Sequence, residues 1–194
     1  MNKKKDNFST TQKETGLSPV RTLALMALFS ALVTVATLVI RIPIPITKGY
    51  FNLGDTVIFI AAALLGPIYG LVCGGVGSAL ADVIGGYAHF APWTLVIKGI
   101  EGLIAGALLR LVRIDPERIV RAMTILAGMF LIAGAWMVLG YFCAEYVIYA
   151  FDITPALAEL PFNVLQGGIS ALTATVVCPF LLKGLDERLL FRQQ

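Results

Sequence analysis

Long apolar stretches separated by short polar segments run through most of the chain. Six of them are long enough, or nearly long enough, to cross about 30 Å of hydrocarbon as helices. They cover residues 20–40, 56–71, 68–84, 93–112, 122–149 and 162–182. The second and third meet at Gly66-Pro67, which predicts a tight turn between two short helices. The pattern predicts an all-α integral membrane protein whose six transmembrane helices form a bundle.

Composition supports a membrane protein with one folded unit. Hydrophobic residues make up 58% of the 194 positions and charged residues 14%, whereas a soluble domain carries about 25% charged residues. Residues 1–18 are polar and poor in apolar side chains, so we expect a disordered cytoplasmic tail there. Residues 19–194 contain no long linker and no convincing internal repeat. They predict a single six-helix membrane domain that binds a substrate.

The distribution of Lys and Arg predicts the orientation of the helices. Twelve of the fifteen basic residues fall in three segments that an even number of crossings places on one side of the membrane. They are Lys3, Lys4, Lys5, Lys13, Arg21, Arg110, Arg113, Arg118, Arg121, Lys183, Arg188 and Arg192. Because cytoplasmic loops carry an excess of Lys and Arg, both termini are predicted to be cytoplasmic. The basic charge therefore follows from topology, and the expected partner is the lipid bilayer, not nucleic acid.

Charged residues within the fourth stretch are the strongest indication of function. A charge in the middle of a membrane helix costs roughly 2.5–3.5 kcal/mol, so such residues usually have a partner or a task. Lys98 and Glu101 are three residues apart and can reach each other on one helix face. They form either a self-neutralising pair that only helps packing or the polar floor of a pocket. In the pocket, Lys98 would meet an electron-rich group and Glu101 a donor.

Further polar side chains lie near the predicted outer ends of the other spans. Asp82 in the third span and Glu145 in the fifth lie about one turn from those ends. Asn163 and Gln166 share one face of the sixth span, whose first turn Pro161 is expected to form. The predicted inner half is almost purely hydrocarbon. A conducting pore or an autonomous carrier needs polar groups along its whole path, so this distribution predicts capture from the outside.

The start of the second span adds two more candidates. Asn52 and Asp55 stand immediately before and within its first turn. Asp55 is either a helix cap stabilised by the helix dipole or a ligand contact, and the sequence favours neither.

The predicted outer loops are rich in aromatic and proline residues. Residues 41–54 form the first outer loop, in which residues 42–45 are expected to be extended because Pro43 and Pro45 restrict the backbone. Residues 151–161 form the third outer loop. The loop at 85–93 carries Tyr87, His89 and Trp93. Such rings suit a lid over a small flat molecule, although an interfacial aromatic belt explains Trp93 equally well.

Small residues recur at helical spacing in two spans. In the third span they are Gly66, Gly70, Gly74, Ser78 and Gly86, and this spacing predicts close helix packing. In the first span, Ala27 and Ala31 would also let another helix lie close. That helix belongs either to the same bundle or to a partner subunit.

The sequence gives no support for an enzyme. It lacks the Gly-rich phosphate loop of ATPases, and no nucleophile and base have credible spacing. Its three cysteines fall in apolar spans without metal-ligand spacing and are expected to be packing residues.

Four segments occur in order along the six-span frame: YFNLGD at 50–55, LGPIYG at 65–70, GSALADVIGG at 77–86 and IKGIEG at 97–102. Together they resemble the substrate-binding S component of energy-coupling factor (ECF) vitamin transporters. The resemblance implies a multi-pass protein of a prokaryotic plasma membrane that binds a water-soluble vitamin or precursor from outside. It also implies two kinds of partner: a transmembrane coupling subunit that docks at Ala27 and Ala31, and two cytoplasmic ATPase subunits that use ATP. No cofactor is expected in this chain.

Members of that family take flavins, pyridoxine-like compounds, pyrimidine thiamin precursors, pantothenate or other small metabolites. Aromatic loops beside lysine, carboxylates and amides favour a pyridoxine- or hydroxymethylpyrimidine-like heteroaromatic here. The predicted binding residues are Asn52, Asp55, Asp82, Tyr87, His89, Trp93, Lys98, Glu101, Glu145, Asn163 and Gln166. The alternative function is an autonomous proton- or sodium-coupled secondary transporter, because carboxylates lie at membrane depth.

Overall fold

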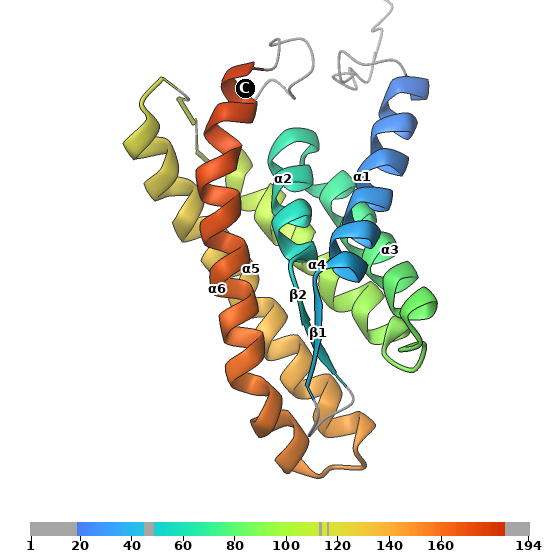
Figure 1. The fold of residues 1–194 in the computed structure, drawn as a ribbon. Coiled ribbons are helices and arrows are strands. Elements are labelled where there is room, and N and C mark those ends of the chain that lie inside the picture. The colour runs from blue at the N-terminus through green and yellow to red at the C-terminus, as the bar shows by residue number, and fades with distance from the viewer. Residues whose placement is uncertain (1–18, 45–48, 113, 116, 185–194) are drawn as a thin grey trace, which may run out of the picture.

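The computed structural model describes residues 19–44, 49–112, 114–115 and 117–184. These residues form a helical bundle with one short hairpin (Figure 1). The helices are α1 (Pro19–Val39), α2 (Gly54–Leu65), α3 (Pro67–Gly85), α4 (Ala91–Arg110), α5 (Ile119–Ile148) and α6 (Ile153–Gly184). The antiparallel strands β1 (Arg41–Pro43) and β2 (Tyr50–Asn52) pair with Ile42 opposite Phe51. Residues 41–43 are therefore extended, as predicted for 42 and 43. The expected tail at 1–18 lies outside the described residues.

Five of the described helices are long and apolar enough to cross a membrane, and α2 is a shorter apolar helix. At 1.5 Å per residue its 12 residues span about 18 Å, less than the hydrocarbon thickness. It ends at Leu65 because Gly66 has a φ of 93° and Pro67 begins α3. The turn at Gly66-Pro67 is thus confirmed. The predicted continuation of the second span to residue 71 is wrong.

Glycines bring the backbones of α3 and α4 together. A Cβ atom on Gly70 would lie 2.6 Å from the carbonyl oxygen of Gly102, and one on Gly106 would lie 2.6 Å from the Cα of Pro67. Neither distance is compatible with a side chain, so the contact exists only because these positions are glycine. Gly77 makes the corresponding close approach to α1, at the carbonyl oxygen of Ser30. The packing role predicted for Gly70 and Gly74 is confirmed.

This interface yields a prediction on stability. In Gly74→Ala the new Cβ would lie 2.5 Å from the carbonyl oxygen of Lys98 and 3.0 Å from Ile58. We expect the variant to lose about 1–3 kcal/mol of unfolding free energy through overpacking. Gly128→Ala in α5 is the matched control: nothing lies within 4 Å of its Cβ position, and alanine should gain about 0.5–1 kcal/mol in a helix. Thermal unfolding in detergent measures both, and equal midpoints would contradict the prediction.

The helices α5 and α6 form a long pair that extends past the hairpin at the end far from the C-terminus (Figure 1). α6 begins at Ile153, and Pro161 lies inside it. The predicted third outer loop at 151–161 and the placement of Pro161 in the first turn are therefore wrong. The helix begins earlier because Asp152 Oδ1 accepts a hydrogen bond from the Thr154 N–H at 2.9 Å. This bond lowers the pKa of Asp152.

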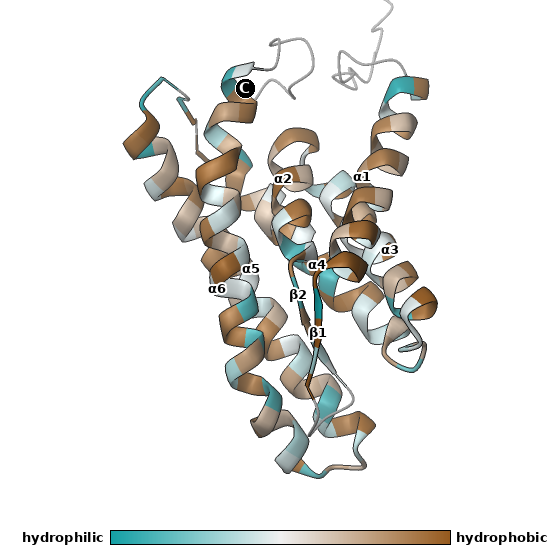
Figure 2. Ribbon diagram, in the orientation of Figure 1, coloured by the Kyte–Doolittle hydropathy of each residue, from teal (hydrophilic) through white to brown (hydrophobic). Residues whose placement is uncertain are grey.

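The interior changes character along the bundle. Toward the end where α6 terminates, the core is apolar and includes Phe59 and Phe130, whose rings stack with centroids 4.8 Å apart. Toward the hairpin, polar and charged side chains replace it. Hydrophobic residues make up most of the helical ribbon (Figure 2), and many large ones are exposed, as a lipid-facing surface requires.

Candidate ligand-binding site

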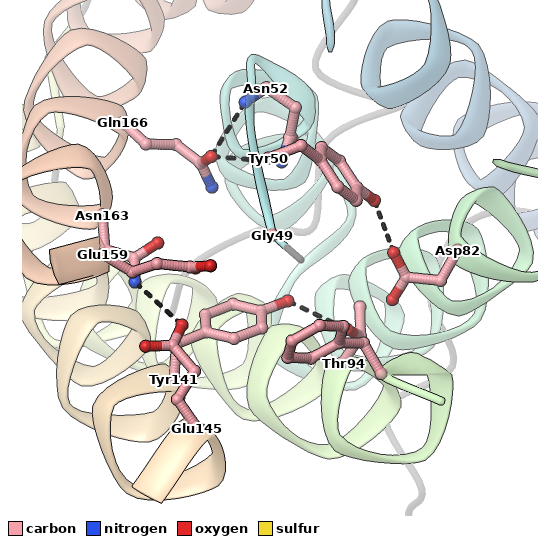
Figure 3. Close-up of a pocket in the computed structure, with 11 residues that line it drawn as sticks. Gly49, Tyr50, Asn52, Asp82, Thr94, Tyr141, Glu145, Glu159, Asn163 and Gln166 are labelled. Atoms are coloured by element: carbon pink, nitrogen blue, oxygen red, sulfur yellow. Dashed lines mark hydrogen bonds between the residues drawn. The ribbon is translucent and has the colours of Figure 1, made fainter. Parts of the chain in front are cut away.

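A cavity of about 30 Å³ lies between the hairpin and the helices α3 to α6. Polar and aromatic side chains from several elements converge on it (Figure 3). It is lined by Gly49, Tyr50, Asn52, Asp82, Phe90, Thr94, Tyr141, Glu145, Glu159, Asn163 and Gln166. The volume is enough for a water molecule and far less than the roughly 300–1,000 Å³ of drug-sized ligand pockets. In this structure the cavity is therefore too small to hold a vitamin-sized ring.

The hairpin side of the cavity is held by Tyr50. Its hydroxyl donates to Asp82 Oδ1 at 2.5 Å. Burial and the neighbouring Asp82 carboxylate both raise the pKa of Tyr50, so the phenol keeps the proton it donates. The Tyr50 ring packs against Tyr87 with centroids 4.7 Å apart. Arg41 lies 5.4 Å from the Tyr87 ring and donates to the Gly85 carbonyl oxygen. Tyr87 therefore supports Tyr50 and does not itself line the cavity.

Gln166 joins three elements at the cavity wall. Its Oε1 accepts from the backbone N–H and from Nδ2 of Asn52, at 2.9 and 3.1 Å. Its Nε2 donates to Asp55 Oδ2 at 2.9 Å. One amide of α6 thus fixes β2 and the first turn of α2. All these polar atoms are buried, so the links are expected to be stiff.

The charged residues of α4 lie behind the cavity wall. Lys98 forms an ion pair with Asp55 and a second with Glu101, whose Oε2 is 3.3 Å away. All three side chains are at most 2% exposed. The predicted reach between Lys98 and Glu101 is present, with Asp55 as a third member. Lys98 is therefore neutralised by protein and is not among the lining residues.

Asp55 does not cap its helix. The N-cap position of α2 is Leu53, and no side chain caps it. The Asp55 carboxylate instead points to Lys98 and Gln166. The helix-cap interpretation is wrong, and a direct ligand contact has no support from the cavity lining either.

A third group of side chains comes from α5 and α6. Asn163 Nδ2 donates to Glu145 Oε1 at 3.4 Å, and the carboxyl groups of Glu145 and Glu159 face each other. Tyr141 donates to Thr94 Oγ1 at 3.0 Å. Figure 3 shows Glu145 and Glu159 on one side of the cavity and Asp82 on the opposite side. The two sides therefore present carboxylates to the same space.

The structure divides the predicted binding residues into three groups. Asn52, Asp82, Glu145, Asn163 and Gln166 line the cavity. Asp55, Lys98 and Glu101 form the buried ion cluster behind it. Tyr87, His89 and Trp93 lie in or just after the loop between α3 and α4. There His89 packs on Phe90, with centroids 4.5 Å apart, and Trp93 is 38% exposed.

Several lining residues were not predicted. They are Gly49, Tyr50, Phe90, Thr94, Tyr141 and Glu159. Helical spacing held a usable signal for two of them, because Tyr141 precedes Glu145 by four residues and Glu159 precedes Asn163 by four. Within the described residues, no group of His, Cys, Asp or Glu is arranged to hold a metal ion.

The small-residue face of α1 points away from the bundle. Ala27 and Ala31 are exposed, together with Leu23, Leu28 and Leu32. Further along the helix, Thr34 is buried against α3 and donates to the Gly77 carbonyl oxygen at 2.8 Å, whereas the turns that carry Ala27 and Ala31 are exposed. Internal packing therefore does not account for Ala27 and Ala31.

One family model and several known proteins match this chain. The family model described as ECF-type riboflavin transporter, S component, matches residues 18–185. The thiamine precursor transporter HmpT of Lactococcus lactis subsp. cremoris is 28% identical over 163 residues, which are 84% of this chain and 88% of that protein. An uncharacterized protein in gap 3′ region of Pyrococcus woesei is 49% identical over 117 residues, 60% of this chain and 73% of that protein.

A solved structure gives the same picture of the fold. The crystal structure of an S-component for biotin from an ECF-type ABC transporter superposes with a TM-score of 0.64, at 22% identity. The match covers 91% of this chain and 100% of that one. At this identity, the likeness shows that the two chains share a fold.

Proposed function

The chain belongs to the ECF-type riboflavin transporter S component family, and from that we propose that it captures one water-soluble vitamin or precursor from outside the cell. Its family and fold are those of transporter components, not of enzymes. The observation that carries the proposal is the buried cavity at the hairpin end, where β2, α3, α4, α5 and α6 each contribute polar or aromatic groups. Ligand sites of this kind are concave, with a few polar groups among rings.

We also propose how the chain sits in the membrane. All six helices would cross a prokaryotic plasma membrane, with both termini in the cytoplasm and the cavity near the outer surface. The excess of Lys and Arg at the opposite end supports this orientation. Because α2 is short, it would cross only with help from the hairpin, whose strands extend the α1–α2 connection toward the outer side.

The proposed partners are a transmembrane coupling subunit and two cytoplasmic ATPases that supply ATP hydrolysis. The exposed alanines of α1 support a docking role, because small residues let a foreign helix approach closely. The proposed binding residues are the lining set, with Tyr87, His89 and Trp93 at its outer side and Asp55, Lys98 and Glu101 behind it.

For the ligand we propose a pyridoxine- or hydroxymethylpyrimidine-like heteroaromatic. Tyr50, Phe90 and Tyr141 offer ring faces, while amide and carboxyl groups surround them. The similarity to a thiamine precursor transporter supports the second of these compounds.

The test begins with the full chain purified alone in detergent, followed by mass spectrometry of any small molecule that remains bound. We expect one vitamin-like compound at one copy per chain. Reconstituted alone, the chain should bind this compound without accumulating it in vesicles under a proton or sodium gradient. Accumulation by the chain alone would replace the proposal with an ion-coupled carrier, for which the buried Asp55 and Glu101 carboxylates are the relevant observation.

A variant of the cavity wall should weaken this binding. In Gly49→Ala, the nearest atoms to the new Cβ are those of the Glu159 carboxyl group, which leave it no room. We expect Glu159 to be displaced and the affinity to fall at least about tenfold, equivalent to 1.4 kcal/mol. Gly168→Ala in α6 is the control, because nothing lies within 4 Å of its Cβ position. Isothermal titration with the compound identified above compares the two, and equal affinities would contradict the prediction.

A further inference from the structure

We infer that the ligand carries amino or ring N–H donors, and no carboxylate or phosphate, in the part that meets Glu145 and Glu159. The inference rests on the proposed binding function. It narrows the class of ligand from any vitamin-like molecule to a nitrogen-rich or cationic one. It follows from an excess of hydrogen-bond acceptors in the cavity wall.

The first step concerns the two facing carboxyl groups. Glu145 and Glu159 are at most 4% exposed and lie opposite each other across the α5–α6 contact. Glu145 Oε2 and Glu159 Oε1 have no hydrogen-bond partner among the described residues. A buried acceptor left without a donor costs about 1–3 kcal/mol, and more when it is charged. A donor placed between these oxygens would satisfy both.

The second step concerns the far wall. Asp82 Oδ1 accepts from Tyr50, whereas Asp82 Oδ2 is buried without a partner among the described residues. Three carboxyl groups therefore line one small space. Thr94 lies within hydrogen-bonding reach of Asp82, and Glu145 and Glu159 can satisfy each other only by sharing a proton. Asn163 and Gln166 each place one amide N–H on a carboxylate, that of Glu145 and that of Asp55, and their second N–H groups do not reach the unpartnered oxygens of these three carboxyl groups.

The third step is the lack of a counter-charge in the lining. Among the described residues that line the cavity, none is Lys, Arg or His. Lys98 is held by Asp55 and Glu101, and Arg41 donates to the Gly85 carbonyl and lies over Tyr50 and Tyr87. Within the described residues the cavity wall thus offers carboxyl groups without a cation of its own, and a ligand that brings positive charge or donors would complement it.

The aromatic lining points to the same chemistry. Tyr50, Phe90 and Tyr141 present rings beside the carboxyl groups, and such faces attract cations and flat electron-poor rings. A ligand with a carboxylate or phosphate would face three acidic side chains without a compensating cation, which excludes it by repulsion. The site thus selects an aminated heteroaromatic and rejects acidic vitamins.

The test compares ligands of equal shape and different charge, using thermal unfolding and isothermal titration of the full chain in detergent. The first set is pyridoxamine, pyridoxine and 4-pyridoxic acid, which differ in one substituent. The second is 4-amino-5-hydroxymethyl-2-methylpyrimidine and its 4-hydroxy analogue. Thiamine, riboflavin, riboflavin 5′-phosphate, biotin and pantothenate complete the panel. In whichever set binds, we expect the amino compound to bind at least about tenfold tighter than its hydroxyl analogue, and the acids not at all.

Glutamine variants of the two facing glutamates test whether these side chains cause the preference for amino compounds. Glu145→Gln and Glu159→Gln should each weaken binding of the best amino compound about 10- to 100-fold, as expected for a lost charge-assisted hydrogen bond. Without ligand they should unfold at the same temperature as the parent protein or higher, because each removes one of two buried carboxyl groups that face each other. Glu117→Gln, an exposed carboxylate paired with Lys183, is the control and should change neither property.

Three results would overturn the inference. Binding of biotin, pantothenate, 4-pyridoxic acid or riboflavin 5′-phosphate as tightly as any amino compound would do so while leaving the capture function intact. An unchanged preference for the amino compound in both Glu145→Gln and Glu159→Gln would also overturn the inference. Failure of the whole panel to bind would remove the proposed function, and the inference with it.

Discussion

Replacing Lys98 with methionine is expected to lower the free energy of unfolding by about 3–5 kcal/mol. Methionine keeps most of the side-chain volume, so the loss is electrostatic: Asp55 and Glu101 would remain buried without their cation. The effect should be visible as a large drop in the thermal unfolding temperature of the detergent-solubilised chain. Ligand affinity would fall as a secondary effect, through the Asp55–Gln166 link to the cavity wall.

The chain contains its own control for this prediction. Lys183 also pairs with a carboxylate, Glu117 at 3.1 Å, but the two side chains are 54% and 70% exposed. Lys183→Met should cost only about 0–1 kcal/mol. Removing all three buried charges together, in Asp55→Asn/Lys98→Met/Glu101→Gln, should restore much of the loss seen in Lys98→Met. A single Lys98→Met variant as stable as Lys183→Met would show that the buried cluster does not need its cation.

Ala27→Trp is expected to abolish vitamin uptake while leaving binding by the isolated chain unchanged. The indole would project from the exposed face of α1 and keep a partner helix at a distance. The cavity is lined by other elements and should not respond. The measurement pairs uptake in cells that express the coupling subunit and ATPases with titration of the purified variant.

The control for this second prediction is Ala135→Trp. Ala135 is also an exposed alanine, but it lies on α5, on the other side of the bundle from α1 (Figure 1). The Ala135→Trp variant should retain uptake if the docking surface is specific to α1. Uptake that survives Ala27→Trp, or is lost equally in Ala135→Trp, would contradict the assigned surface.

The helices were largely predictable because each is a long apolar run. The ends of the helices were harder to predict, as α6 illustrates. Pro161 is a favoured residue of a first helical turn, and this preference outweighed the weaker Asp152–Thr154 cap signal in the sequence. In a bundle, neighbouring helices tolerate a proline inside a membrane helix, so the stronger local signal gave the wrong start.

The same error hid part of the site. With residues 151–161 assigned to a loop, Glu159 had no helical face to share with Asn163 and Gln166, although the three are spaced by four and three residues. The Asp55–Lys98 pair was inaccessible for a different reason. Its members are 43 positions apart, and only the packing of α2 against α4 brings them together. Helical spacing identified the Lys98–Glu101 pair because that contact is local.

The small volume of the cavity has a kinetic consequence. A heteroaromatic ring cannot occupy about 30 Å³, so the lining must separate before the ligand enters. Tyr50, Asn52 and Gln166 hold that lining through buried hydrogen bonds, and opening it breaks several of them at once. Association should then be slower than diffusional encounter, and the open form will be a minor population in the free protein. A slow entrance implies an equally obstructed exit. A long residence time of the bound ligand is therefore expected from the barrier to opening, in addition to the contacts that the ligand makes.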